Sequence, residues 1–155
     1  CQAVFAQAQN FEEISYVPGE ALAQELSTDG VKIGTVYRAL DSAGSSLGYV
    51  IETTSGEGYG GNITLYAGIT NDGIVNGVSI LSISETPGLG MRAGEVLIPQ
   101  FAGKMATGFT YTKSGSQSDS EIDAISGATI TTEAVTNAVN GAVSAFTRDL
   151  QKGGE

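Results

Sequence analysis

Apolar residues recur at helical spacing near both ends of the chain. Val4, Phe5, Ala8, Phe11 and Ile14 form one such stripe, which predicts a helix within residues 1–14. Pro18-Gly19 ends it, and residues 21–26 predict one more short helical turn. A second stripe predicts a helix over residues 132–148, and its members are Ala134, Val135, Ala138, Val139, Ala142, Val143 and Phe146.

The middle of the chain alternates between apolar and polar residues, which is typical of strands. Residues 31–40 and 47–54 predict a hairpin across the polar segment 41–46. Residues 62–70 predict a further strand, and the turn Asn71-Asp72-Gly73 leads into another over residues 74–84. Pro87-Gly88 favours a turn that ends this antiparallel meander.

The pattern as a whole predicts an α+β fold, a mainly antiparallel twisted sheet flanked by helices. We expect a single domain over residues 1–155, with a helical lead-in over 1–30 and a core over 31–150. Residues 90–105 predict one or two short helices around Pro99, and residues 114–120 predict a polar loop.

Charge and composition exclude several classes of function. The chain has 155 residues, of which 41% are hydrophobic, and a formal net charge of −10. Such a charge argues against nucleic-acid binding, which depends on Lys and Arg, and disfavours adsorption to an anionic membrane surface. The sequence contains no apolar run of about 18 residues, the length that a membrane-spanning helix requires.

The chain contains no His and no Trp, and its one Cys is Cys1. Ser-His-Asp and Cys-His catalysis are therefore excluded, as are His-ligated metals. An internal disulfide and a thiolate-held iron–sulfur cluster are excluded because each needs more than one Cys. Any redox chemistry in this chain would depend on a bound organic cofactor.

The segment Asp123-Ala124-Ile125-Ser126-Gly127-Ala128-Thr129 comes directly before the C-terminal helix. A small, hydroxyl-rich loop at a helix N-terminus favours an anion, because unpaired N–H groups and the positive end of the helix dipole meet there. Spacing alone favours a simple capped helix start, with Thr131 or Thr132 as the N-cap and Glu133 in the first turn.

The same segment resembles the flavinylation signature Asp-x-x-Ser-Gly-Ala-Thr of the FMN-binding domains in the RnfG and NqrC subunits of membrane redox pumps. Further motifs of that family follow its order, and they are Gly58-Tyr59-Gly60-Gly61-Asn62-Ile63, Gly73-Ile74-Val75-Asn76-Gly77-Val78, Ser84-Glu85-Thr86-Pro87-Gly88-Leu89-Gly90 and Gln100-Phe101-Ala102-Gly103-Lys104. The resemblance covers about residues 58–146. It implies that Thr129 carries FMN through a phosphoester bond.

The resemblance also assigns the phosphate end of the cofactor to residues 126–132. Ser126 and Thr131 offer hydroxyl groups, and Gly127 lets the backbone approach closely because it has no Cβ. Ala128 belongs to the same cofactor-binding stretch. No Lys or Arg lies in this stretch, which suits a covalent ester better than noncovalent capture. Asp123 would belong to the sequence recognised by a magnesium-dependent flavin transferase that uses FAD, although an exposed turn or cap Asp fits the residue equally well.

By the same resemblance, the loop that begins at Glu85 lines the isoalloxazine ring. Leu89 would cover a ring face at a tight tip between Gly88 and Gly90, and Thr86 would form a hydrogen bond. Without the resemblance, Leu89 packing into the core is an equal alternative. Glu85 holds the loop or touches the flavin, Tyr59 would stack on or edge the ring, and Lys104 would pair with a carboxylate or reach the cofactor.

The implied function is electron transport by a flavoprotein most like the G subunit of an Rnf complex, an ion-transporting membrane translocase. The domain would relay electrons between other subunits, binding no diffusible substrate and acting as an electron carrier rather than a self-contained enzyme. A docking patch is expected near Leu89 and Met91. Its place would be the extracytoplasmic side of the cell membrane, held by an N-terminal anchor absent from this chain, unless Cys1 is the lipidated first residue of a lipoprotein.

Other functions stay open at this point. Within the class, the alternatives are the C subunit of a Na⁺-translocating NADH:quinone reductase and a stand-alone extracytoplasmic flavin carrier. A noncatalytic protein-binding module is the alternative of another class. An FMN-dependent reductase of a small molecule is a weaker alternative, because without His or an internal Cys only Tyr, Lys or carboxylates could donate the proton.

Overall fold

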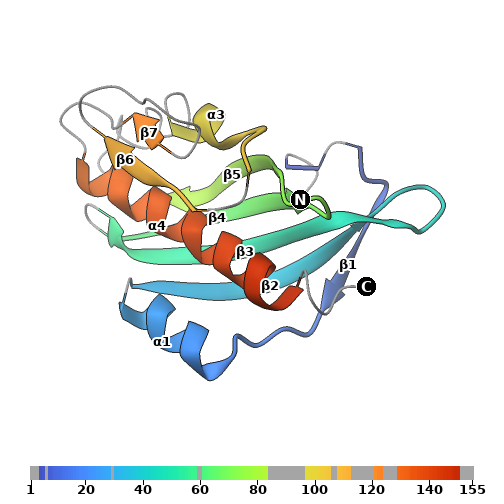
Figure 1. The fold of residues 1–155 in the computed structure, drawn as a ribbon, viewed down its shortest axis with the longest axis horizontal. Coiled ribbons are helices and arrows are strands. Elements are labelled where there is room, and N and C mark those ends of the chain that lie inside the picture. The colour runs from blue at the N-terminus through green and yellow to red at the C-terminus, as the bar shows by residue number, and fades with distance from the viewer. Residues whose placement is uncertain are drawn as a thin grey trace.

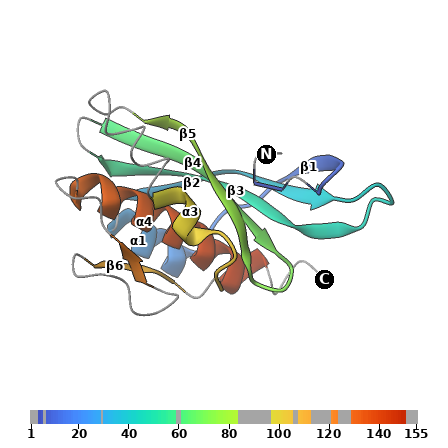
Figure 2. The same cartoon turned by 90° about the horizontal axis from the view of Figure 1, so that it is seen from above.

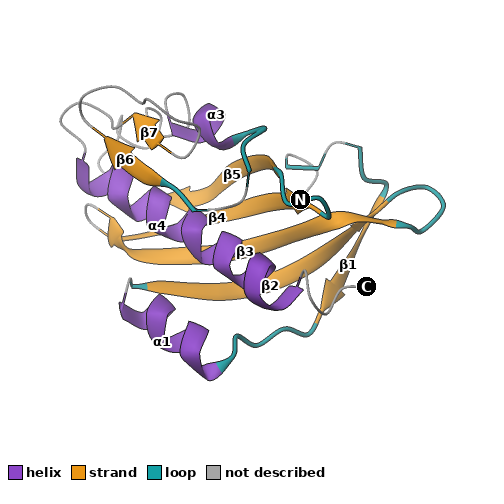
Figure 3. Cartoon of the chain, viewed as in Figure 1, coloured by secondary structure: helices purple, strands orange, loops and turns teal. Residues whose placement is uncertain are grey.

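The protein folds as a sheet covered on one face by helices (Figure 1). Our computed structural model describes residues 4–5, 7–28, 30–58, 61–83, 97–105, 108–112, 121–123 and 129–150. In the view from above, α1, α3, α4 and β6 lie on the same side of the sheet (Figure 2). Figure 3 separates the helices, strands and loops by colour. The predicted α+β class with a mainly antiparallel sheet is confirmed.

The sheet has five antiparallel strands in the order of the sequence, from β1 to β5. The strands are β1 (Asn10–Ile14), β2 (Val31–Leu40), β3 (Ser46–Gly58), β4 (Gly61–Thr70) and β5 (Val75–Ile83). The predicted hairpin and meander are therefore confirmed. Gly73 adopts φ 84°, a left-handed conformation that glycine accepts without strain, and its N–H donates to Thr70 O at 2.9 Å.

The helix predicted within residues 1–14 is wrong for residues 10–14, which form strand β1. Phe11 pairs with Ala39, and Ile14 pairs with Val36. The apolar residues of this stripe are buried in two different places. Val4, Phe5 and Ala8 pack with Val50 on one face of the sheet, whereas Ile14 packs on the other face with the main core. Apolar residues that are buried on both faces of a sheet can have the same spacing in the sequence as the buried face of one helix.

Helix α4 (Thr129–Ala145) crosses one face of the sheet (Figure 1), and its apolar residues pack against the sheet in the main core. The predicted stripe is confirmed, since its seven members are all at most 4% exposed. A π-helix, η2 (Phe146–Leu150), continues α4. Among the described residues, no helix is long and apolar enough to cross a membrane.

Helix α1 (Glu20–Thr28) lies beside α4 and covers the start of β2 (Figure 1). Leu22 and Leu26 are buried against Val31 and Ala145. Arg148 of η2 forms an ion pair with Glu25 at the surface. The predicted short helical turn at residues 21–26 is therefore confirmed, and the helix is longer than the prediction.

A small group of short elements lies above the start of α4 in the view of Figure 1. It consists of α3 (Ile98–Phe101) and the parallel strands β6 (Thr110–Thr112) and β7 (Glu121–Asp123). The predicted short helix around Pro99 is confirmed. The rings of Phe101 and Phe109 meet edge to face, with centroids 5.0 Å apart. The polar loop predicted over residues 114–120 lies outside the described residues.

Candidate functional site

The signature segment is bounded by two elements of fixed position. Strand β7 ends at Asp123, and helix α4 begins at Thr129. Ser126, Gly127 and Ala128, predicted to surround the phosphate, lie outside the described residues. Asp123, the last residue of β7, is exposed. Its recognition by a transferase stays a prediction.

Thr129, the predicted attachment residue, is the first residue of the 17-residue helix α4. The first turn of a helix presents N–H groups that have no partner within the helix, and it is the positive end of the helix dipole. The first turn of α4 contains no acidic residue that would oppose an anion. A helix start of this kind favours an anion near its backbone N–H groups.

The expectation that Thr131 or Thr132 caps the helix is wrong, because α4 begins at Thr129 and both residues lie within its first turn. Thr132 is fully buried, and its carbonyl accepts a 2.8 Å hydrogen bond from the Thr136 hydroxyl. Core packing thus extends the helix toward the signature. The predicted contact of Thr131 with a phosphate oxygen stays a prediction.

Tyr111 and Glu133 join β6 to α4 one helical turn beyond Thr129. The Tyr111 hydroxyl donates to Glu133 Oε2 at 3.3 Å. The nearby negative charge of Glu133 raises the pKa of Tyr111 above its ordinary value. Residues four apart in a helix share a face, so Thr129 and Glu133 occupy neighbouring positions. The prediction that Glu133 lies in the first turn is wrong, because the helix begins at Thr129 and its first turn holds no acidic residue. The sequence gave no signal for the pairing of Glu133 with Tyr111.

Gln100 holds the backbone of Asp123 from α3. Its side-chain Nε2 donates to Asp123 O at 3.1 Å, and its Oε1 accepts from Asp123 N at 2.7 Å. One carboxamide therefore binds both backbone groups of the first residue of the signature. In the sequence, Gln100 stands out only as part of a family motif, and no local pattern points to this partner.

The rest of the Gln100–Lys104 motif attaches α3 to the edge of the main sheet. Phe101 is fully buried. Gly103 adopts φ 80°, and its N–H donates to Val75 O at 2.7 Å, while Val75 N donates to Lys104 O at 2.7 Å. The motif thus connects β5 to the start of the signature. What the Lys104 side chain binds stays a prediction.

The buried polar side chains gather between β3 and α4. Within the described part of the chain, the polar residues classed as buried are Thr53, Ser55, Thr132 and Thr136. The hydroxyl groups of Thr53 and Ser55 have no hydrogen-bond partner there. Figure 1 shows that the far end of β3 and the start of α4 lie at the same end of the molecule. Polar groups are thus concentrated toward the end that carries the signature.

The residues predicted to line the isoalloxazine ring are not tested by the structure. Glu85, Thr86, Gly88, Leu89 and Gly90 follow β5 and lie outside the described residues, as do Tyr59 and the rim residue Met91. Cys1 also lies outside them. The assignment of these residues stays a prediction.

Comparison with known families matches residues 58–144 to the FMN-binding domain. The chain belongs to the FMN-binding domain family. The matched residues include both ends of the signature, Asp123 and Thr129, and also Gln100, which binds Asp123. The recognition made from the sequence motifs is therefore confirmed.

Three curated relatives are named as G subunits of ion-translocating oxidoreductase complexes. The chain is 33% identical over 147 residues to the G subunit of the Na(+)-translocating ferredoxin:NAD(+) oxidoreductase complex of Acetobacterium woodii, covering 94% of this chain and 71% of that protein. It is 35% identical over 145 residues to the G subunit of the ion-translocating oxidoreductase complex of Methanosarcina acetivorans, covering 90% and 69%. It is 41% identical over 112 residues to the G subunit of the proton-translocating ferredoxin:NAD(+) oxidoreductase complex of Clostridium ljungdahlii, covering 72% and 60%.

The fold is similar to that of a solved structure, Shewanella oneidensis NqrC. The TM-score is 0.61 at 18% sequence identity, and the match covers 94% of this chain and 84% of that one. This likeness shows that the chain shares the fold of NqrC.

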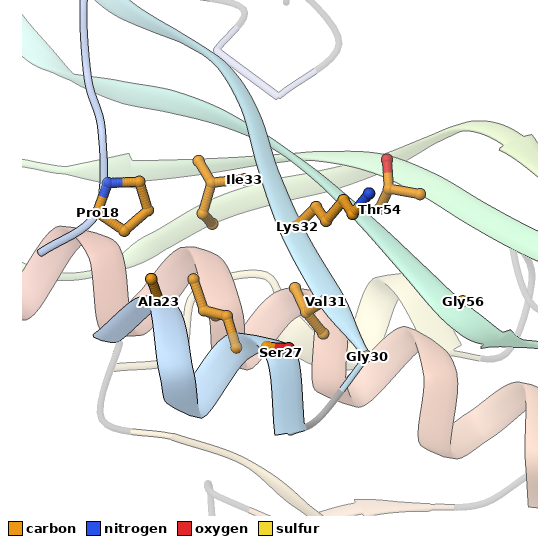
Figure 4. Close-up of a pocket in the computed structure, with 10 residues that line it drawn as sticks. Pro18, Ala23, Ser27, Gly30, Val31, Lys32, Ile33, Thr54 and Gly56 are labelled. Atoms are coloured by element: carbon orange, nitrogen blue, oxygen red, sulfur yellow. The ribbon is translucent and has the colours of Figure 1, made fainter. Parts of the chain in front are cut away.

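An apolar groove of about 490 Å³ lies between α1 and the sheet (Figure 4). Ala23, Leu26 and Ser27 of α1 form one wall, and Val31 and Ile33 of β2 form another. The other lining residues are Pro18, Gly30, Lys32, Thr54 and Gly56. All of them precede residue 58, where the FMN-binding domain match begins, and none is a predicted site residue.

Proposed function

We propose that this chain is the FMN-carrying part of a G subunit in an Rnf-type ion-translocating ferredoxin:NAD oxidoreductase complex. The observation that carries the proposal is the position of Thr129, which ends the family's signature and begins a long helix with no acidic residue in its first turn. The relatives named as G subunits support the assignment, because two of them match at least 90% of this chain.

The proposed attachment is a transfer of FMN from FAD to the Thr129 hydroxyl. The Thr129 oxygen forms a bond to the phosphorus on the flavin side of the FAD pyrophosphate, and the bond from that phosphorus to the bridging oxygen breaks. AMP leaves, and the hydroxyl proton passes to a base of the transferase or to water. No oxidation or reduction occurs. The chain has no His, so we assign the activation of the hydroxyl to a separate magnesium-dependent transferase.

Bound FMN would supply one-electron transfer, and the residues of the chain would hold it in place. The N–H groups of the first turn of α4 would stabilise the ester phosphate. The loop over residues 85–90 would cover the ring, and an apolar rim near Leu89 and Met91 would dock against the neighbouring subunits. The domain would lie on the extracytoplasmic side of the membrane.

Two alternatives have specific support. The NqrC-like fold keeps open the C subunit of a Na⁺-translocating quinone reductase, but the 18% identity to NqrC is well below the 33–41% identity to the three G subunits. The net charge of −10 suits a noncatalytic module that binds a basic protein partner. That module would remain colourless when it is expressed together with the transferase.

Replacing the attachment residue tests the proposal. Thr129→Val should remove all covalent flavin from protein coexpressed with the transferase, because the acceptor oxygen is gone. Thr28→Val makes the same chemical change at the exposed end of α1, outside the predicted site, and is the matched control that should keep the flavin. In-gel flavin fluorescence after denaturation measures the attachment, and circular dichroism measures the fold. Covalent flavin on Thr129→Val, or an unfolded Thr129→Val protein, would contradict the proposed role of Thr129.

A further inference from the structure

We propose that Gln100 is a positioning residue for flavin attachment, which fixes the point where the chain enters the signature. The inference rests on the proposed attachment of FMN to Thr129. It concerns the described residues at one end of the signature, where the Gln100 carboxamide binds both backbone groups of Asp123 at 3.1 and 2.7 Å.

The chemistry of the carboxamide explains why two bonds form. A carboxamide carries a donor and an acceptor in one plane, as a backbone peptide does, so it pairs with Asp123 as a neighbouring strand would. Strand β7 has only three residues and pairs with β6, which is equally short. Ile122 is fully buried in the main core, and the two bonds from Gln100 fix the backbone of the exposed residue Asp123 that ends β7.

Gln100 is itself held firmly, which a positioning residue requires. Its neighbours Leu97 and Phe101 are fully buried, and Phe101 packs against Phe109. The following residues bind Val75 of β5 through two backbone bonds of 2.7 Å. The direction of the chain at Asp123 is therefore fixed relative to the main sheet, as the position of Thr129 is through α4.

Five residues separate these two held ends. With the backbone of Asp123 and the start of α4 both held, a transferase that recognises Asp123 and modifies Thr129 would meet these two residues in a fixed relation. Orientation of this kind raises the rate of a bimolecular step, because less freedom is lost on reaching the reactive complex. If Gln100 is removed, Thr129 remains but Asp123 loses the two bonds that orient its backbone.

The test measures the rate of FMN attachment to the purified chain by a purified flavin transferase with FAD and Mg²⁺, well below the unfolding temperature. Gln100→Ala removes both bonds, and Gln100→Glu keeps an acceptor but loses the donor to the Asp123 carbonyl. We expect both variants to lower the kcat/KM of the transferase for this chain at least about tenfold. Amide exchange at Asp123 should become faster in both.

Two control variants separate positioning from stability. Gln24→Ala makes the same chemical change at an exposed site on α1 and should attach FMN at the rate of the unmodified chain. Leu26→Ala lowers stability through the core, away from the signature, and should also leave the rate unchanged. A loss of rate in Leu26→Ala equal to that in Gln100→Ala would overturn the inference.

The outcomes also distinguish this inference from the proposed function. An unmodified chain that accepts no FMN at all would overturn the proposed function, and the inference with it. An unmodified chain that accepts FMN, with Gln100→Ala accepting it equally fast, would overturn the inference alone.

Discussion

Tyr111 forms a hydrogen bond to Glu133 close to the start of α4, and the charge of Glu133 changes the pKa of Tyr111. The negative charge of Glu133 raises the pKa of the Tyr111 phenol, because an anion nearby opposes the formation of a second anion. Tyr111 therefore stays protonated, and continues to donate its hydrogen bond, to a higher pH than an isolated tyrosine would.

We predict that Glu133→Gln lowers the pKa of Tyr111 toward the ordinary value of 10.0. A tyrosine whose pKa is raised in the folded state contributes stability below its unfolded pKa and loses it as the pH rises through the folded value. The unmodified chain should therefore lose stability from this pair as the pH rises above about 10. Carbon NMR of the tyrosine Cζ atoms measures the pKa. An unchanged Tyr111 titration in Glu133→Gln would contradict the assignment.

Gly48 shows how closely the N-terminal segment approaches the sheet. A Cβ atom at this position would lie 2.2 Å from Ile69 O and 2.8 Å from Phe5 Cζ. The backbone of β4 cannot move away without breaking its pairing with β3. Gly48 therefore makes room for Phe5 to cover the second face of the sheet.

We predict that Gly48→Ala lowers the free energy of unfolding by about 1–3 kcal/mol, as overpacked sites do. Gly77→Ala in β5 is the matched control, since its Cβ atom would lie 3.4 Å from its nearest neighbour, an ordinary contact. Its effect should stay within about 0.5 kcal/mol. Urea denaturation of the two variants measures the difference. Equal effects would mean that Phe5 does not pack as described.

Helix α1 is held to the rest of the molecule by burial rather than by charge. Leu22 and Leu26 are at most 6% exposed. In the ion pair between Glu25 and Arg148, the two side chains are 57% and 47% exposed, so water screens the attraction. The second guanidinium nitrogen of Arg148 donates to Glu25 Oε1 at 3.2 Å, which adds direction to the pair but little stability.

We predict that Leu26→Ala lowers the free energy of unfolding by about 2–4 kcal/mol, through lost burial and the cavity that remains. Glu25→Ala should lower it by less than about 1 kcal/mol, as surface ion pairs do. Thermal denaturation of both variants at matched salt makes the comparison. A larger loss for Glu25→Ala than for Leu26→Ala would show that charge, not burial, fixes α1.

The long elements could be predicted from the sequence because each buries one face at a regular period. Ile63, Leu65, Ala67 and Ile69 alternate along β4, and the stripe of α4 faces the sheet. Strand β1 could not be predicted, since its neighbourhood buries residues on both faces of the sheet. Strands β6 and β7 have three residues each, too few for a period to show.

The sequence predicts which residues belong to the site, because they carry the family motifs, but it predicts few of the contacts between them. The motifs located Thr129, and the structure places it at the start of α4. The pairing of Gln100 with Asp123 joins residues 23 positions apart, and local pattern carries no information on such a contact. The N-cap prediction failed for Thr132 because tertiary burial extended the helix beyond its local signals.

At the scale of the whole molecule, the fold holds the two residues that bound the signature, Asp123 at the end of β7 and Thr129 at the start of α4. Helix α4 crosses the sheet and brings Thr129 to one end of the molecule, where α3 and β7 also lie (Figure 1). The main core is continuous from the sheet through α4 to Phe101 and Ile122, so α4 and β7 pack into the same hydrophobic core. The start of α4 and the end of β7 are thus held in a fixed relation.

The measurement that tests the central claim most directly is the intact mass of the chain, with its visible spectrum, after coexpression with a flavin transferase and export. We predict a mass gain of one FMN less one water, and a yellow colour that survives denaturation. Expression without the transferase should give the unmodified mass. An unmodified mass and a colourless protein in the presence of an active transferase would contradict the account and favour a noncatalytic binding module.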